Sequence, residues 1–235
     1  MKTYDHTASV WREMIPRLGL IVLQADETIE GEVFNSFKLV EKTLHVTRIP
    51  SGLDVSTTNL AQMEHDLPAA AELFPRGCEF DCVAYGCTSG TSVVGADKVH
   101  DLVKRGVKTR YVTDPLTATI AWCRLHDIKR LALLSPYVED VNEGLRSALS
   151  AAGVQTPVFG SFNVAQEAAV ARIDEKSIIE AGINLCESGD ADALFLSCTN
   201  LRTEMARPAI RAATGRSVIS SNSVLCWHIK HLIAG

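Results

Sequence analysis

The sequence FDCVAYGCTSGTSVVG, residues 80–95, decides how this chain folds. It begins with a largely apolar run, typical of a buried strand of a parallel sheet, which ends at Gly86 and Cys87. The residues that follow are small, so no large side chain blocks their backbone N–H groups. We therefore expect a strand that leads into a loop able to hold an anion beside a thiol.

Short apolar runs of this kind alternate with longer amphipathic stretches along the chain. The predicted strands are residues 18–23, 44–49, 80–85, 109–112, 130–134, 158–160, 193–196 and 217–220. The predicted helices are residues 28–42, 58–73, 96–105, 116–126, 138–152, 173–187, 203–213 and 223–234. Strands separated by helical segments of this length imply βαβ crossovers, so the predicted fold class is α/β with parallel sheets.

Two segments of the chain resemble each other. FDCVAYGCTSGTS and ADALFLSCTNLRT each carry an aspartate, an apolar strand and then Cys-Thr, and their cysteines, Cys87 and Cys198, are almost half the chain apart. The pattern predicts two pseudo-symmetric Rossmann-like halves, residues 1–114 and 115–235, with the C-terminal helix packing back on the first half. Parallel strands that end in small polar residues are common in doubly wound folds, so coincidence is the alternative.

Composition narrows the classes of partner. The chain has 235 residues, 46% of them hydrophobic, which is enough to bury a core. Its net charge of −5 and the absence of a basic run give no reason to expect binding to nucleic acid or to an anionic membrane, so a small molecule is the expected partner. The first residues lack the apolar core of a signal peptide and no run is long enough to span a bilayer, which predicts a cytoplasmic protein.

The seven cysteines are an odd number without a secretory signal, so we expect free thiols. A zinc site at Cys78, Cys82 and Cys87 is not expected, because no CxxC pair is present and a strand would scatter the sulfurs over different faces. We expect no metal and no cofactor. Gly86-Cys87-Thr88-Ser89-Gly90 is not the G-x-S-x-G of a hydrolase, and neither a P-loop nor a dinucleotide fingerprint is present.

Both repeated cysteines are expected at the carboxyl ends of parallel strands, where open α/β sheets bind ligands. Thr88, Ser89 and Thr199 are natural N-cap residues, and Asn222 could cap the last helix. The field of a helix N-terminus favours thiolate over thiol, so we expect Cys87 and Cys198 to have lowered pKa values.

The paired motifs, Cys-Thr-Ser-Gly-Thr at 87–91 and Ser-Cys-Thr-Asn at 197–200, resemble those of the aspartate/glutamate racemase superfamily. Within it, the chain is most similar to the maleate cis–trans isomerase and arylmalonate decarboxylase branch. LGLIVLQADETIEGE at 18–32, LLSPYVEDVN at 133–142 and SSNSVLCW at 220–227 support this resemblance. The run LQADETIE at 23–30 also resembles the ectoine-utilisation member of the superfamily.

The resemblance implies cofactor-free chemistry at a carbon next to a carboxylate, in an active site in the cleft between the halves, with one catalytic cysteine on each face of the substrate. In a racemase one cysteine removes a proton and the other returns one. In a cis–trans isomerase a thiolate adds to a double bond, the resulting single bond rotates, and elimination gives the other isomer. The substrate would be a small carboxylate or amino-acid derivative, and a homo-oligomer is expected. The expected substrate-binding residues are Gln24, Asp26, Thr88, Ser89, Tyr137, Thr199, Asn200 and Asn222.

The chain departs from the motifs of the related enzymes at three places, and these departures limit which reaction and substrate the resemblance implies. Decarboxylases of this branch keep a cysteine only at the second motif, whereas this chain has both. Typical maleate isomerases have Pro-Ser-Ser-Asn after the first strand, whereas this chain has Leu-Gln-Ala-Asp; an ionised Asp26 would repel a second substrate carboxylate by about 1 kcal/mol in water. Amino-acid racemases usually have Cys-Thr-His at the second motif, where this chain has Asn200.

Two alternatives stay open at this level. One is an arylmalonate-type decarboxylase. The other is a non-enzymatic module that binds a small carboxylate, which would need the anion loop but not two reactive thiols. Faster alkylation of Cys87 and Cys198 than of the other cysteines would favour an enzyme.

Overall fold

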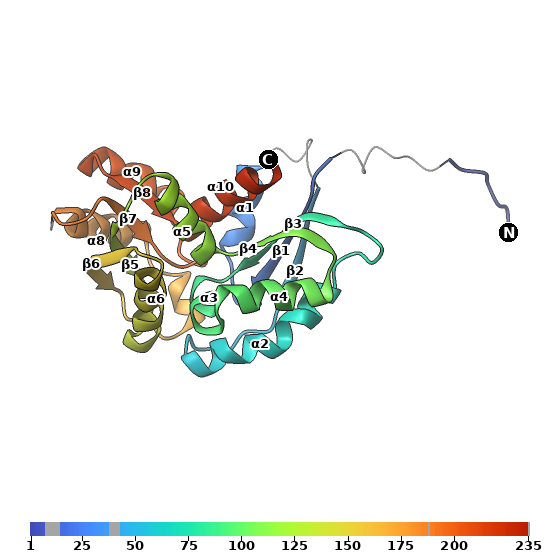
Figure 1. Ribbon diagram of the computed structural model, residues 1–235, viewed down its shortest axis with the longest axis horizontal. Helices are drawn as coiled ribbons and strands as arrows, with labels where there is room; N and C mark the ends of the chain where they lie inside the picture. The colour runs from blue at the N-terminus through green and yellow to red at the C-terminus, as the bar shows by residue number, and fades with distance from the viewer. Residues whose placement is uncertain (8–14, 38–42, 188, 235) are drawn as a thin grey trace.

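The computed structural model describes residues 1–7, 15–37, 43–187 and 189–234, and it contains two four-stranded sheets, each entirely parallel (Figure 1). The first sheet has the order β2-β1-β3-β4 and the second β6-β5-β7-β8. The strands are β1 (Arg17–Leu23), β2 (Thr43–Ile49), β3 (Phe80–Gly86), β4 (Thr109–Thr113), β5 (Arg130–Ser135), β6 (Gln155–Ser161), β7 (Ala193–Leu196) and β8 (Ser217–Ser220). The strand order is the same in both sheets, which confirms the predicted α/β class and the similarity of the two halves.

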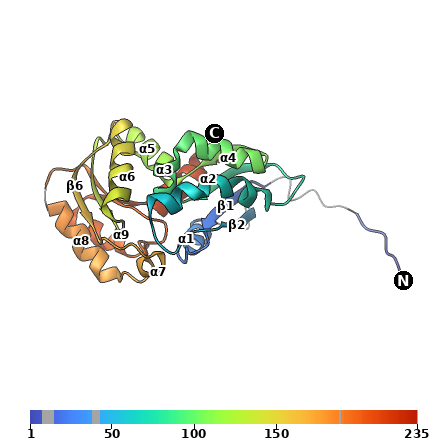
Figure 2. The same ribbon diagram turned by 90° about the horizontal axis from the view of Figure 1, so that it is seen from below.

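Helices connect the strands and cover the sheets (Figures 1 and 2). They are α1 (Ile29–Ser36), α2 (Thr57–Glu72), α3 (Thr88–Val94), α4 (Ala96–Gly106), α5 (Pro115–Leu125), α6 (Glu139–Ala151), α7 (Glu167–Val170), α8 (Glu175–Glu187), α9 (Ala206–Thr214) and α10 (Ser221–Ala234). Because the paired strands are parallel, the carboxyl ends of β1 and β3 lie at one edge of the first sheet, and those of β5 and β7 lie at one edge of the second.

The first sheet is covered on both faces because its strands alternate their side chains between two clusters. Leu18, Leu20 and Val22 of β1 pack with α1 and α10, whereas Ile21 and Leu23 belong to the larger cluster that also contains residues of α2 and α4. The last helix therefore packs on the first sheet although it follows the last strand of the second. The packing of α10 on the first sheet connects the two halves of the molecule.

Every predicted strand is present, but the helix predictions need correction. Two short helices, α3 and α7, were not predicted, because TSGTSVV and EAAV are too short for an amphipathic repeat. The helix expected from residue 203 begins at Ala206, after a turn. The part of the first predicted helix at 38–42 lies outside the described residues.

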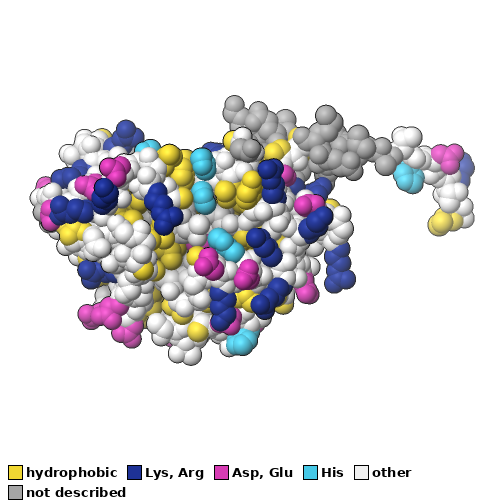
Figure 3. Space-filling model, in the orientation of Figure 1, with side chains coloured by type: hydrophobic (Ala, Val, Ile, Leu, Met, Phe, Trp, Pro, Cys, Tyr) yellow, Lys and Arg dark blue, Asp and Glu magenta, His cyan; other side chains and the backbone are white. Residues whose placement is uncertain are grey.

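On the face seen in Figure 3, Lys and Arg side chains are interspersed with Asp and Glu rather than gathered in one basic patch. Within the described part of the chain, no helix has the length and apolar character that crossing a membrane requires. All seven cysteines are free thiols, and all but Cys78 are buried.

Candidate active site

Cys87 is held by the backbone that immediately follows it. It is the N-cap of α3, and its Sγ accepts a hydrogen bond from the Gly90 N–H at 3.1 Å. The Ser89 hydroxyl lies 3.7 Å from the same sulfur. Thr88 and Ser89, expected as N-caps, instead form the first turn of the helix, because the cysteine already occupies the cap position. A Cβ on Gly90 would lie 2.9 Å from this sulfur, so the loop requires glycine at that position.

Cys198 has a different setting, although it follows the equivalent strand of the second sheet. Its φ of +123° is rare for a residue with a side chain and costs on the order of 1–3 kcal/mol. Its N–H donates to the Ser221 hydroxyl at 3.0 Å, across to the start of α10. The prediction that Thr199 caps a helix is wrong, because the chain turns instead and the next helix begins only at Ala206. The Cys198 thiol itself interacts with the Tyr137 hydroxyl and with the Asn200 N–H, so a contact from another loop and a local one hold it together.

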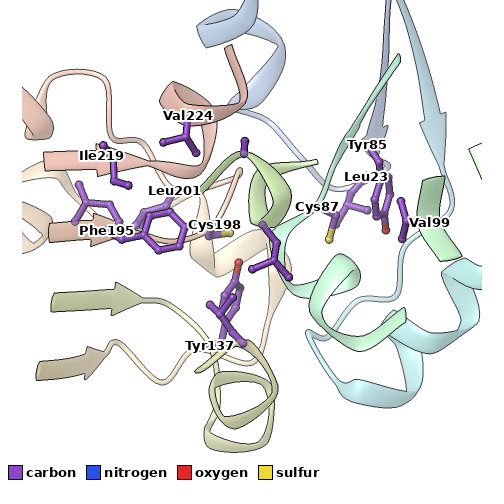
Figure 4. Close-up of a cluster of buried hydrophobic side chains, with 14 of the residues drawn as sticks. Leu23, Tyr85, Cys87, Val99, Tyr137, Phe195, Cys198, Leu201, Ile219 and Val224 are labelled. Atoms are coloured by element: carbon purple, nitrogen blue, oxygen red, sulfur yellow. The ribbon is translucent and has the colours of Figure 1, made fainter. Parts of the chain in front are cut away.

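A buried tyrosine hydroxyl accompanies each thiol. Tyr137, from the loop after β5, hydrogen-bonds Cys198 and is also close enough for the charge of Cys87 to raise its pKa. Tyr85, the penultimate residue of β3, hydrogen-bonds Cys87 and donates to the Met63 sulfur at 3.0 Å. Figure 4 shows the Tyr137 hydroxyl pointing toward Cys198, with Cys87 across the boundary between the halves. The two thiols thus share one region, as the sequence predicts.

Hydrogen bonds join the halves around the thiols. The Thr88 and Ser221 hydroxyls are 2.8 Å apart, so Ser221 connects the Cys87 loop to the Cys198 backbone. The Thr199 hydroxyl donates to Gly86 O at 3.1 Å. Cys87 is only 2% exposed and Cys198 only 6%. Both cysteines are therefore almost entirely buried.

Three of the remaining predicted substrate-binding residues, Asp26, Asn200 and Asn222, are buried, and the fourth, Gln24, is exposed. Asp26 and Asn200 are buried beside the thiol loops; the Asn200 amide oxygen accepts the Glu27 N–H at 2.9 Å. Gln24 is exposed and does not join this buried group. Asn222 lies inside the first turn of α10 and is not its cap, because the helix begins one residue earlier. Its amide donates to Thr199 O at 2.9 Å and lines a pocket of about 290 Å³ together with Glu32 and Arg207.

Glu167 is a site residue that the sequence analysis missed. It begins α7, is 6% exposed, and its charge raises the pKa of both Cys87 and Cys198. Its N–H donates to Leu53 O at 3.1 Å, and Figure 2 shows α7 reaching the first half near α1. Nothing local marks this glutamate among the 28 acidic residues of the chain, since its position depends on a contact between distant loops.

The prediction of lowered thiol pKa values is wrong. Burial raises the pKa of Cys87 to about 12 and that of Cys198 well above its ordinary value, with the Glu167 charge as the next cause for both. The Gly90 N–H and the tyrosine hydroxyls oppose these shifts but do not overcome them. Desolvation outweighs the helix terminus because the thiols are almost entirely out of water.

Burial also raises the pKa of the nearby carboxyls. The pKa of Glu167 rises to about 7, through desolvation and then the charge of Asp26, and the Asn200 side chain opposes the shift. Burial likewise raises the pKa of Asp26. Within the described residues, no group of three or more His, Cys, Asp or Glu side chains is arranged to hold a metal ion. The chemistry that this arrangement can support is proton transfer or nucleophilic addition by sulfur, with hydroxyl and N–H donors around it.

Comparison with known proteins agrees with this geometry. The family model for arylmalonate decarboxylase matches residues 69–234. The arylmalonate decarboxylase of Bordetella bronchiseptica is 29% identical over 120 residues, and the match spans about half of each protein, 51% of this chain and 50% of that one. The maleate isomerase of Nocardia farcinica is 25% identical over 200 residues, covering 78% of this chain and 76% of that enzyme.

A solved structure shares the fold over nearly the whole chain. It is the Nocardia farcinica maleate cis–trans isomerase, in a cysteine-to-serine mutant with a covalently bound succinylcysteine intermediate. It superposes with a TM-score of 0.81 at 23% identity, covering 94% of this chain and 93% of that one. Because the family model covers well over half of the sequence, this chain belongs to the arylmalonate decarboxylase family.

Proposed function

We propose that this protein is a cofactor-independent isomerase that acts on a small carboxylate through Cys87 and Cys198. The observation that carries the proposal is the convergence of the two thiols: both follow equivalent strands, and Tyr137 and Glu167 interact electrostatically with both of them. Two thiols that approach one region from two different sheets suit a reaction that removes a proton from one face of a carbon and returns one to the other.

In the racemase form of the proposal, one cysteine enters as thiolate and the other as thiol. The thiolate takes the proton on the carbon next to the carboxylate, and the electron pair is delocalised onto the carboxylate oxygens. The second thiol gives its proton to the opposite face and becomes the thiolate. Donors from Thr88, Ser89 and Tyr137 stabilise the charge on the carboxylate, and one such donor contributes on the order of a hundredfold in rate.

A cis–trans isomerase is the other form of the same proposal. One thiolate adds to a carbon–carbon double bond beside the carboxylate, the resulting single bond rotates, and elimination returns the thiolate and the isomerised alkene. The succinylcysteine found in the Nocardia farcinica maleate isomerase is an adduct of this kind on that enzyme, and it supports this form here.

Decarboxylation is the second candidate, favoured by the family match and by the arylmalonate decarboxylase relative. In that reaction the electron pair left by departing CO₂ is delocalised onto the remaining carboxylate, and a single thiol protonates the carbon. One cysteine would be sufficient, so the presence of both Cys87 and Cys198 favours the isomerase.

A proton NMR time course in D₂O tests these possibilities together. The protein is incubated with maleate, phenylmalonate and both enantiomers of a panel of 2-amino and 2-hydroxy carboxylates, beside Cys87→Ser and Cys198→Ser. Loss of an α-proton signal that requires both cysteines indicates racemisation, and fumarate formed from maleate indicates cis–trans isomerisation. Loss of CO₂ that requires Cys198 alone indicates the decarboxylase, and no change in any compound contradicts the enzyme proposal.

A further inference from the structure

Three loops of the molecule meet at the side chain of Asn200. Its Nδ2 lies 3.3 Å from Ala25 O, in the loop after β1, and 3.4 Å from Glu167 O, at the start of α7. Asn200 itself is two residues beyond Cys198. One amide thus places Asp26, Glu167 and the Cys198 loop around a common point, with carboxyls from both halves of the molecule.

Asp26 is only partly satisfied in this position. Its Oδ1 accepts hydrogen bonds from the N–H groups of Thr28, at 2.8 Å, and Ile29, at 2.9 Å. Its Oδ2 is buried and has no partner within ordinary hydrogen-bond distance among the described residues. The Thr199 hydroxyl donates to Gly86 O, although it lies near enough to Asp26 to lower the pKa of that carboxyl. The whole residue is 4% exposed, so water reaches this oxygen poorly. A buried carboxylate oxygen without a donor is costly, and a ligand that donates hydrogen bonds would remove that cost.

The second carboxyl, that of Glu167, lies near the same region, and none of the groups that shift its pKa among the described residues is a cation. Glu167 is near enough to Asp26 and to both thiols for their charges to interact. The groups that shift the Glu167 pKa are Asp26 and Asn200, neither of them basic. Arg48 interacts with Asp26 but hydrogen-bonds three backbone carbonyls and pairs with Glu30, and Arg172 pairs with Glu27 at the surface. The site therefore holds two acidic side chains from different halves, and a positively charged ligand group beside them would be electrostatically favourable.

We propose that Asp26 and Glu167 form a subsite for the protonated amine of the substrate, so that this protein acts on carboxylates that carry an ammonium group and not on dicarboxylates. The inference rests on the proposed function of the same site. The ammonium group donates to Asp26 Oδ2 and to the Glu167 carboxylate, while the substrate carboxylate lies on the side of Thr88 and Ser89. A dicarboxylate in that orientation would place a negative charge beside two others.

Such a substrate would also help to ionise the thiols. Burial and the Glu167 charge hold the pKa of Cys87 at about 12, so few thiolates form without a positive charge nearby. An ammonium group next to Glu167 offsets that charge and favours the thiolate. Activation of the base is then coupled to binding of the correct substrate, and a carboxylate without the amine would bind next to thiols that stay protonated.

Matched pairs of ligands test the subsite on the full-length protein. 3-Aminopropanoate is compared with succinate, and each enantiomer of 2-aminobutanoate with ethylmalonate, so that an ammonium replaces a carboxylate on the same carbon skeleton. Titration calorimetry is expected to show at least one amine binding about tenfold more tightly than its dicarboxylate partner. Equal or weaker binding of every amine, including no binding at all, overturns the inference.

Three variants locate the effect. Glu167→Gln and Asp26→Asn keep the shape of each side chain and are each expected to reduce the preference for the amine about tenfold or more. Glu32→Gln neutralises another buried carboxyl of raised pKa, outside the proposed subsite, and is expected to leave the preference unchanged. A preference that survives in both Glu167→Gln and Asp26→Asn overturns the assignment of the amine to these residues.

The outcome for the subsite is separable from that for the proposed function. If a dicarboxylate is isomerised with dependence on both cysteines and every amine binds no more tightly than its partner, the proposed function stands and the subsite falls. If amines bind with the expected dependence on Glu167 but none exchanges its α-proton in D₂O, the subsite stands and the isomerase proposal loses its support.

Discussion

Cys87 and Cys198 occupy equivalent places in two sheets of identical strand order, yet their thiols are held in different ways. The Cys87 sulfur caps a helix and accepts the N–H of Gly90, three residues further along the chain. The Cys198 residue adopts a positive φ and hydrogen-bonds Ser221, 23 residues away and on the helix that packs on the other sheet. The contacts of Cys87 named here come from its own loop, whereas Cys198 combines the local Asn200 N–H with contacts from Tyr137 and Ser221 in distant segments.

The comparison teaches that a shared motif fixes the position of a residue in the fold but not its environment. The segment after Cys87 has three small residues and can coil at once into α3, whereas the segment after Cys198 has Asn200, Leu201 and Arg202 and turns toward the first half. We infer that the two cysteines contribute differently to the proposed reaction.

The largest expected effect is the loss of either thiol. Cys87→Ser and Cys198→Ser are each expected to reduce kcat on the order of a thousandfold, because a serine hydroxyl is a far weaker acid and its conjugate base does not form at neutral pH. The NMR exchange rate in D₂O measures this. Cys78→Ser is the matched control and is expected to keep the wild-type rate. A variant at Cys87 that retains most of the activity would restrict the chemistry to Cys198 and favour the decarboxylase.

The two tyrosines provide the second comparison. Tyr137→Phe is expected to lower kcat about a hundredfold, or about 3 kcal/mol, because its hydroxyl hydrogen-bonds Cys198 and lies near the charge of Cys87. Tyr85→Phe is expected to cost less than about tenfold, since the Tyr85 hydroxyl is directed in part to Met63. Steady-state kinetics at fixed pH measures both, and equal losses would show that the two thiols depend equally on their phenols.

A glycine substitution tests the local support of Cys87. In Gly90→Ala the new Cβ would lie 2.6 Å from the Tyr85 hydroxyl and 2.9 Å from the Cys87 sulfur, so we expect the free energy of unfolding to fall by about 1–3 kcal/mol. Gly144→Ala in α6 meets nothing within 4 Å and is expected to raise it by roughly 0.5–1 kcal/mol. Denaturant unfolding measures both values. An unaffected Gly90→Ala would mean that the Cys87 loop can rearrange as freely as the surface of α6.

The smallest effect concerns pH. Above about pH 7 the Glu167 carboxyl is ionised and opposes ionisation of both thiols; below it the carboxyl is protonated and has no such effect. Glu167→Gln is therefore expected to speed iodoacetamide labelling of Cys87 and Cys198 by about two- to tenfold at pH 8–9, with the difference vanishing below pH 7.

Mass spectrometry of each labelled cysteine across this pH range measures the effect. Glu32→Gln serves as the control, because the pKa of that carboxyl is also raised to about 7 but Glu32 is not among the groups that shift the pKa of Cys87 or Cys198. A difference between Glu167→Gln and the wild type that persists at pH 5–6 would contradict the assignment, because the glutamate is then neutral in both proteins.

Much of the fold could be predicted because it depends on local patterns. Apolar runs at regular spacing identify all eight strands, and the repeat around the two cysteines identifies the two similar sheets. The short helices α3 and α7 escaped prediction because they are stabilised by what surrounds them and not by an amphipathic repeat. The division at residues 114 and 115, the homo-oligomer, the cytoplasmic location and the resemblance to the ectoine-utilisation member stay predictions.

The sequence by itself determined the positions of the strands, the α/β class, the family and the paired cysteine motifs, because apolar periodicity and the repeated Cys-Thr pattern are local features of the chain. Only the tertiary structure decided the environment of those cysteines. Ser221, Asn200 and Glu167 reach the thiols or their loops through contacts between distant segments. Burial, which no local pattern specifies, then reversed the expected shift of the thiol pKa values, because removing a thiolate from water costs more than one helix terminus returns.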